Sequence, residues 1–215
     1  MRSSGEALTI AGPAGELEAR LERPDGEPRF RALICHPHPL FGGTMDNKVV
    51  TTLARACRQA GGVALRFNFR GVGASQGAFD DGGGETEDLI AAEAWLREQW
   101  PQAPLWLAGF SFGSYVAARG ARVLADNDSP AVHLFLVAPP VHHLDFDSVE
   151  QTRCPVTLVQ SDDDEVVPAQ RVLEWAQRTP LNPDVIRLPE AGHFFHGHLG
   201  ELREIALCHM PGQPA

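Results

Sequence analysis

The sequence predicts an α/β fold in which helices cover both faces of a mostly parallel, twisted sheet. Short runs rich in Val, Leu, Ile and Phe alternate with longer helical patterns from about residue 30 onward, as in parallel sheets whose strands are joined by helices. The 215 residues are more than one average domain needs and too few for two, so we expect a single domain over residues 1–215. Hydrophobic residues make up 43% and charged residues 21%, proportions typical of a soluble globular protein.

The elements follow in order from these patterns. Two short strands come first, at residues 7–10 and 17–21, and the Ala-Gly-Pro-Ala-Gly turn between them predicts an antiparallel hairpin leading into the sheet. Later apolar runs predict six strands, at residues 31–35, 63–67, 105–108, 132–137, 156–160 and 185–188. Apolar residues at helical spacing predict five helices, at residues 48–59, 86–99, 112–125, 169–178 and 195–207, with Thr86 as the cap of the second.

Charge and composition exclude several classes of partner. The net charge is −10 and no basic stripe is visible, so a phosphate backbone would be repelled and nucleic acid is excluded as a partner. Residues 1–10 lack the apolar stretch of a signal peptide, and the most apolar runs, such as residues 132–141, are shorter than the roughly 20 residues that span a bilayer. The four cysteines have no C-x-x-C spacing, and we interpret them as buried thiols: Cys35, Cys57, Cys154 and Cys208. We therefore expect a cytoplasmic protein with no membrane partner.

A G-x-S-x-G pattern lies where a predicted strand gives way to a helix. It reads Gly-Phe-Ser-Phe-Gly over residues 109–113. In such a strained turn the serine hydroxyl stands above the sheet edge, and the flanking glycines leave room that side chains would fill. The backbone N–H of Phe112 opens the helix and would face an oxyanion on a substrate carbonyl. Ser111 is thus the candidate nucleophile, and a tight turn with a passive serine is the alternative.

A serine nucleophile needs a histidine base and a carboxylate that orients the histidine. Residues 160–168, Gln-Ser-Asp-Asp-Asp-Glu-Val-Val-Pro, follow one predicted strand, and residues 190–195, Glu-Ala-Gly-His-Phe-Phe, follow the last. Both segments reach the carboxyl edge of the sheet, where Ser111 is expected. Serine, aspartate and histidine then occur in the chain order of one known hydrolase fold.

These motifs resemble the α/β-hydrolase superfamily, and from about residue 30 to 207 the chain is similar to its small single-domain bacterial serine hydrolases and esterases without a cap domain. Residues 36–43, His-Pro-His-Pro-Leu-Phe-Gly-Gly, stand where the family has its oxyanion loop, and residues 68–75, Asn-Phe-Arg-Gly-Val-Gly-Ala-Ser, resemble its F-R-G-x-G-x-S turn. The family's D-x-V-V-P pattern selects Asp164 rather than the fallback Asp163, and its catalytic histidine corresponds to His193. The resemblance implies a triad of Ser111, His193 and Asp164.

The oxyanion needs a second backbone donor besides Phe112. Pro37 and Pro39 have no N–H, which leaves His38, Leu40 and Phe41. The resemblance favours the residue just past the His-Pro motif, so Leu40 is the expected donor. His36 is expected to stabilise the loop.

The nine histidines raise the question of a metal site, since H-x-H and H-G-H spacings occur at residues 36–38 and 196–198. Zinc needs three or four converging ligands, and no such set can be assembled without His193. Residues 71–77, Gly-Val-Gly-Ala-Ser-Gln-Gly, have the wrong spacing and follow the wrong strand for a dinucleotide loop. We expect neither a metal nor another cofactor.

The expected activity is hydrolysis of a small-molecule carboxylic ester through an acyl-enzyme on Ser111. Only about 16 residues join the strands ending near Ala138 and starting near Pro155, enough for a short helix around residues 145–150 but not for a lid. An open apolar surface should then take a short acyl group, with three candidate contacts: Phe41, Phe110 and Phe194. Thioesters, amides or acyl transfer would suit the same residues, and a non-catalytic ligand-binding member of the fold is the alternative from another class.

Overall fold

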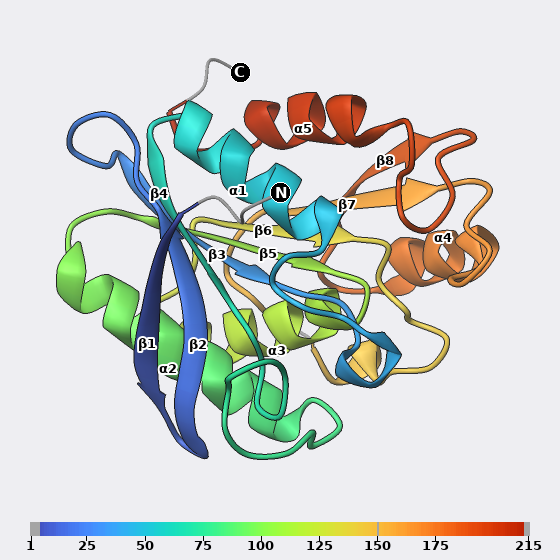
Figure 1. The fold of residues 1–215 in the computed structure, drawn as a ribbon. Helices are drawn as coiled ribbons and strands as arrows, with labels where there is room; N and C mark the ends of the chain where they lie inside the picture. Colours follow the sequence, from blue (N-terminus) through green and yellow to red (C-terminus); the bar gives the residue numbers. More distant parts are fainter. Residues whose placement is uncertain (1–4, 150, 213–215) are drawn as a thin grey trace.

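A twisted eight-stranded sheet forms the centre of the computed structural model, which describes residues 5–149 and 151–212 (Figure 1). The strands lie in the order β1-β2-β4-β3-β5-β6-β7-β8. β1 and β2 form an antiparallel hairpin, β2 lies antiparallel to β4, and the other neighbours are parallel, which confirms the predicted fold class. The bounds are Glu6–Gly12 (β1), Gly15–Glu22 (β2), Phe30–Cys35 (β3), Gly62–Phe67 (β4), Leu105–Phe110 (β5), His133–Val137 (β6), Val156–Ser161 (β7) and Asp184–Leu188 (β8).

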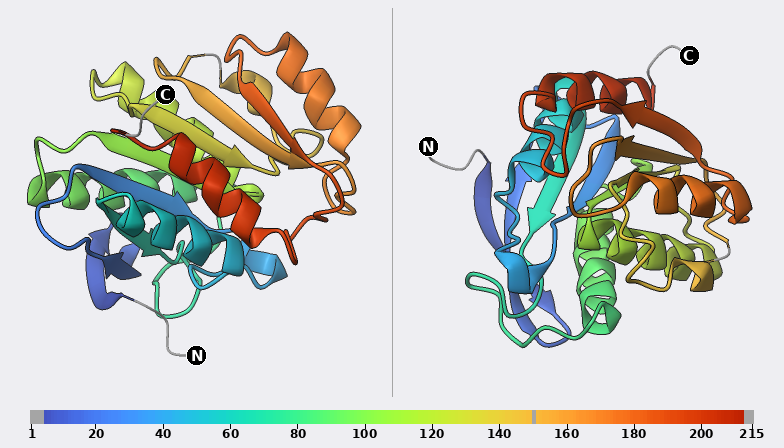
Figure 2. Two further views of the ribbon diagram at one scale, coloured as in Figure 1. Left: turned by 90° about the horizontal axis from the view of Figure 1, so that it is seen from above. Right: turned by 90° about the vertical axis from the view of Figure 1, so that its right-hand side faces the viewer.

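Helices cover both faces of this sheet. α1 and α5 lie side by side on one face, and α2, α3 and α4 lie on the other (Figure 2). Each of α1 to α4 follows the carboxyl end of one strand and returns the chain to the start of the next, as in other parallel sheets, and α5 follows the last strand. The bounds are Lys48–Gln59 (α1), Gly83–Gln99 (α2), Phe112–Asp126 (α3), Ala169–Arg178 (α4) and Leu199–Cys208 (α5).

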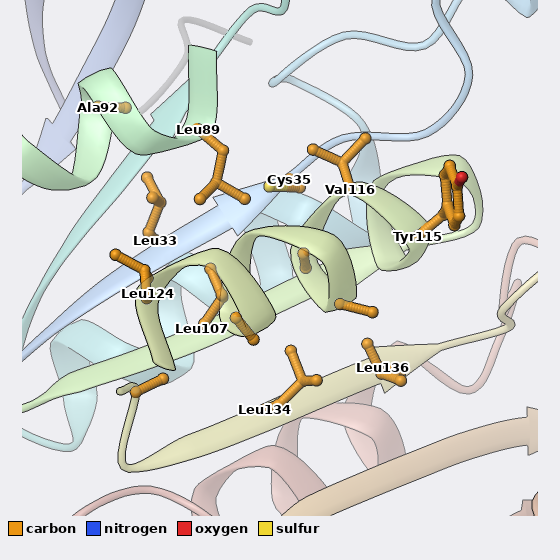
Figure 3. Packing of buried hydrophobic residues seen from close by; sticks show 14 of the residues in the cluster. Leu33, Cys35, Leu89, Ala92, Leu107, Tyr115, Val116, Leu124, Leu134 and Leu136 are labelled. Carbon is orange, nitrogen blue, oxygen red and sulfur yellow. The ribbon is translucent and has the colours of Figure 1, made fainter. Parts of the chain in front are cut away.

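The core is divided by the sheet into two apolar clusters. Successive side chains of a strand point to opposite faces, so Leu107 of β5 belongs to the cluster under α2 and α3, whereas Phe110 belongs to the cluster under α1 and α5. Figure 3 shows part of the first cluster, in which Val116 and Leu124 of α3 lie over the strands. Every residue of β3, β4, β5 and β7 is buried, as expected of parallel strands covered on both faces.

Two helices begin elsewhere than the sequence predicts. α2 starts at Gly83, because the Glu85 carboxylate accepts the backbone N–H groups of Gly82 (2.7 Å) and Asp80 (2.9 Å) and so caps the helix. Thr86 lies inside the first turn and donates its hydroxyl to the Gly82 carbonyl (2.6 Å), so its prediction as the cap is wrong. α5 starts at Leu199 rather than Phe195, since Phe195 has φ 53° and the residues before the helix form turns.

The connection from β6 to β7 contains one 3-10 turn, Phe146–Ser148. This turn falls within the short helix expected around residues 145–150, of which Glu150 lies outside the described residues. The described residues of this connection, 138–149 and 151–155, hold no inserted cap, as the sequence predicts. Among residues 5–149 and 151–212, no helix is both long and apolar enough to cross a membrane.

The four cysteine thiols are free. Cys35 and Cys57 are buried and Cys154 is partly buried, but Cys208 is exposed at the end of α5. The prediction that all four are buried is therefore wrong for Cys208.

Candidate active site

Ser111 lies in the sharp turn between β5 and α3. Its φ of 53° and ψ of −121° are strained for a residue with a side chain, and its backbone N–H donates to the Val137 carbonyl at 2.8 Å. The turn requires glycine at both flanks. A Cβ on Gly113 would overlap the Cys35 carbonyl oxygen of β3, and one on Gly109 would overlap the Gly113 carbonyl oxygen. The G-x-S-x-G pattern therefore holds the serine against the carboxyl ends of the central strands.

A continuous line of hydrogen bonds joins the three residues that the sequence selects. His193 Nε2 lies 3.1 Å from Ser111 Oγ, and His193 Nδ1 lies 2.9 Å from Asp164 Oδ2. The Asp164 side chain is fully buried, and its Oδ1 accepts the backbone N–H groups of Val166 (2.9 Å) and Val167 (2.6 Å). These bonds hold the carboxylate where it can orient the imidazole. The arrangement is that of a serine nucleophile with its base, while the catalytic roles themselves stay predictions.

The two neighbouring aspartates face elsewhere. Asp162 pairs with Arg187 at 2.7 Å, and Asp163 is exposed. The other histidines near the sequence motif also lie outside the hydrogen-bonded line: His196 is exposed, and His198 pairs with Glu201 at 3.0 Å.

The His193 loop has one partner that the sequence did not single out. The Glu165 carboxylate accepts the backbone N–H of His193 at 2.9 Å and so ties the histidine loop to the aspartate loop. In the sequence, the indication of this role is that Glu165 directly follows Asp164. The centroid of the Phe110 ring lies 5.0 Å from that of the His193 imidazole, and this contact further fixes the plane of the imidazole.

The loop after β3 does not leave the Leu40 N–H free. This N–H donates to Nδ1 of His38 at 3.2 Å, because His38 caps the 3-10 turn Pro39–Phe41. The Phe41 N–H donates to the His38 carbonyl at 3.1 Å. Both groups are used within the loop, which argues against Leu40 as the second oxyanion donor.

Two other backbone donors remain beside the serine. Within the described chain, neither the Phe112 N–H nor the His38 N–H has a hydrogen-bond acceptor. His38 lines the same cavity as Ser111, and its ring lies 4.8 Å from the ring of Phe112. His38 therefore replaces Leu40 as the candidate second donor.

His36 holds the base of this loop. Its Nδ1 bonds the Pro37 carbonyl oxygen (2.7 Å), and its Nε2 accepts the backbone N–H of Phe69 (3.0 Å), so the ring is neutral with its proton on Nδ1. Burial lowers the pKa of His36 to about 4. The ring thus links the loops after β3 and β4, which is the structural role expected from the sequence.

The Arg70 turn also serves the framework. The Arg70 guanidinium pairs with the buried Asp88 carboxylate at 2.8 Å, and the Arg70 backbone N–H donates to the same carboxylate at 2.9 Å. The hydrogen bond from the guanidinium to Asp88 raises the pKa of Arg70 above its usual value. The Ser75 hydroxyl donates to the Asn68 carbonyl at 2.7 Å and closes the turn.

An open cavity of about 390 Å³ lies in front of the serine. Phe41, which is 86% exposed, and Phe194, which is 43% exposed, both line it. Phe110 does not line it, because the alternation along β5 turns this side chain into the core, so its prediction as a substrate contact is wrong. The complete lining is Pro37, His38, Phe41, Gly42, Gly43, Asn47, Ser111, Val166, His193 and Phe194.

Two further histidines, His142 and His143, do not line this cavity. His142 lines a separate cavity with residues of α4, and its ring lies 3.8 Å from that of His143. In the part of the chain that the structure describes, no three His, Cys, Asp or Glu side chains are grouped so as to hold a metal ion.

Comparison with known proteins gives the family. No protein-family profile matches the chain. An α/β serine hydrolase homologue from Coxiella burnetii has a TM-score of 0.89 and 47% identity, over 95% of this chain and 96% of that one. An α/β serine hydrolase without lid from Xanthomonas campestris has a TM-score of 0.89 and 40% identity, over 100% and 99%. An uncharacterized protein of Rickettsia prowazekii is 36% identical over 193 residues, which are 86% of this chain and 79% of that protein. The chain belongs to the α/β serine hydrolase family and is one of its members without a lid.

Proposed function

We propose that this hydrolase cleaves carboxylic esters with short acyl groups through an acyl-enzyme on Ser111. The observation that carries the proposal is the line of hydrogen bonds from Asp164 through His193 to Ser111, which ends at an open cavity. In such an arrangement the histidine takes the hydroxyl proton while the serine oxygen attacks, and the carboxylate stabilises the imidazolium that forms.

The reaction then follows in two halves. Ser111 Oγ bonds to the ester carbonyl carbon and His193 Nε2 takes its proton; the carbon–oxygen bond to the alcohol breaks, and His193 gives that proton to the departing oxygen. Water next attacks the acyl carbon as His193 takes a proton from it. The serine oxygen leaves and recovers the proton, so the acid is released and the enzyme is restored.

The negative oxygen of each tetrahedral intermediate needs donors that are in place beforehand. The backbone N–H groups of Phe112 and His38 are our candidates, since both lack an acceptor within the described chain. His38 lines the cavity that holds Ser111, and its ring packs against Phe112, the residue after Ser111, whereas the Leu40 N–H is already bonded to His38.

A fluorophosphonate probe tests the proposal, because it phosphonylates only an activated serine. We expect stoichiometric labelling of the native protein, none of Ser111→Ala, and a rate loss on the order of a millionfold for p-nitrophenyl butyrate in that variant. Matched butyrate esters, thioesters and anilides define the bond that is cleaved, with the ester expected to have the highest kcat/KM. A folded native protein that is neither labelled nor active would instead be a ligand-binding member of the fold.

A further inference from the structure

Asn47 is the cap of α1 and lies in the wall of the Ser111 cavity. Its Oδ1 accepts the Val49 N–H at 2.9 Å, its backbone N–H donates to the Thr44 carbonyl at 3.0 Å, and its carbonyl accepts the Thr51 N–H at 2.9 Å. Since the Val49 N–H needs an acceptor, the orientation of the side-chain amide is fixed by chemistry. Its Nδ2 is left with no acceptor among the described residues.

Besides Asn47, His38, Ser111 and His193, the lining of the cavity is apolar or glycine. Of the described residues, five large hydrophobic side chains are exposed, and four of them come from the loops around this cavity: Leu40, Phe41, Val166 and Phe194. An apolar cavity with a few placed polar groups is the usual form of a small-molecule site, in which the polar groups fix orientation and specificity.

The chemistry of the proposed reaction decides which part of the ester meets Asn47. The departing alcohol oxygen must reach His193 Nε2, so the alcohol lies beside His193 and Phe194. The lining residues His38, Phe41 and Asn47 are then left to contact the acyl group.

We propose that Asn47 is a specificity-determining residue whose Nδ2 donates to an oxygen on the acyl group. The preferred substrates are then esters whose short apolar acyl chain carries a distal carbonyl or similar acceptor oxygen. This inference rests on the proposed esterase function. Because the cavity is open to water, the gain over an apolar chain of the same length should be about tenfold in kcat/KM, below the discrimination of a fully enclosed site.

The test compares p-nitrophenyl esters in pairs of equal acyl length: 5-oxohexanoate with hexanoate, and 4-oxopentanoate with pentanoate. In the native enzyme we expect kcat/KM for the oxo ester of at least one pair to exceed its partner by about tenfold. Asn47→Asp keeps the capping oxygen and replaces the amide donor by an acceptor, so this ratio should fall to one or below. Because both esters are measured on the same sample, the ratio does not depend on the folded fraction.

Two further variants complete the design. Asn182→Asp makes the same charge change in an exposed turn and should keep the native ratio and native rates. Asn47→Ser retains a capping oxygen on a shorter side chain, should also lose the preference, and decides the matter if Asn47→Asp does not fold.

A native ratio near one for both pairs, or an unchanged ratio in the Asn47 variants, overturns the role of Asn47 while leaving the esterase proposal intact. If the native enzyme hydrolyses neither member of any pair, the esterase proposal fails and this inference fails with it.

Discussion

Asp164 differs from the two aspartates that precede it in what its carboxylate contacts. It receives the backbone N–H groups of Val166 and Val167 and faces His193, whereas Asp162 pairs with Arg187 and Asp163 is exposed. In the proposed reaction the charge on Asp164 stabilises the protonated imidazole at each transition state.

Asp164→Asn should therefore lower kcat about 10⁴-fold, because the amide cannot balance the imidazolium charge and favours the wrong tautomer of His193. Asp163→Asn, the matched control, should change kcat less than about twofold. Steady-state hydrolysis of p-nitrophenyl butyrate measures both, with circular dichroism to check folding. A larger loss in Asp163→Asn than in Asp164→Asn would show that Asp163, and not Asp164, orients the histidine.

His36 should make the stability of the protein depend on pH. Burial lowers its pKa to about 4 in the folded protein, against an ordinary value of 6.5. Between these values the unfolded chain binds a proton that the folded chain does not. The contribution of His36 to the free energy of unfolding is therefore fully present above about pH 6.5. It falls as the pH decreases and levels off near pH 4, with a total loss on the order of 3 kcal/mol.

His36→Gln should remove this part of the acid sensitivity. Urea unfolding at pH 7.5 and pH 5 in both proteins measures it, and the difference between the two proteins separates His36 from the carboxylates. An equal decrease in the free energy of unfolding in both proteins would show that His36 is protonated as easily in the folded chain as in the unfolded one.

At the residue scale, sequence order and family motifs select Ser111, Asp164 and His193, and the structure brings these three together. The second oxyanion donor could not be selected in this way, because its availability depends on the His38 ring capping its own loop. Phe110 was misassigned for a similar reason: its place next to Ser111 in the sequence says nothing of the face to which the strand turns it.

At the scale of elements, α2 is joined to the loop after β4 by a buried ion pair. Asp88 is fully buried and receives both the guanidinium and the backbone N–H of Arg70. Glu87 also contacts this guanidinium, at 3.1 Å, but its side chain is 65% exposed. The two carboxylates thus offer a matched comparison between a buried and an exposed partner of one arginine.

Asp88→Asn should destabilise the protein by about 3 kcal/mol, because it leaves a largely buried guanidinium without its buried counter-charge. Glu87→Gln should cost less than about 1 kcal/mol, since water replaces the lost contact. Urea denaturation of the two variants measures both values. Equal effects would mean that Asp88 acts through packing rather than charge.

The bounds of a helix could be predicted where the run of apolar residues at helical spacing begins and ends with the helix itself. The bounds of α1 and α4 agree with the sequence pattern, while α2 and α5 do not. Glu85 caps α2 from inside the helix, and the apolar residues before α5 form turns with helix-like spacing. In both cases the hydrogen-bond partners decide the boundary, and apolar periodicity carries no information about them.

At the scale of the whole molecule, the short β6–β7 connection leaves the serine cavity open. The order of the strands could not be read from the sequence, since the pairing of β3 with β5 joins residues that are 74 positions apart, such as Arg31 and Leu105. The alternation of strands and helices predicts the parallel sheet, but only tertiary contacts choose the neighbours.

The open cavity should favour short acyl chains, because nothing encloses a long one. We expect kcat/KM to be higher for p-nitrophenyl butyrate than for palmitate, with no increase in rate when the substrate passes its solubility limit. Rates measured across that limit test this. A preference for palmitate with a rate increase at the interface would mean that another segment serves as a lid.

The position of β8 at the edge of the sheet has a consequence for local opening. Among the described strands β8 pairs with β7 alone, and of its five residues only Leu188 is buried, yet the next loop carries His193. Opening of β8 costs less free energy than global unfolding, and it would withdraw the base from Ser111 while the inner strands stay paired. Activity should then be lost at lower urea concentrations than the circular dichroism signal, and the amides of β8 should exchange hydrogen before those of β5.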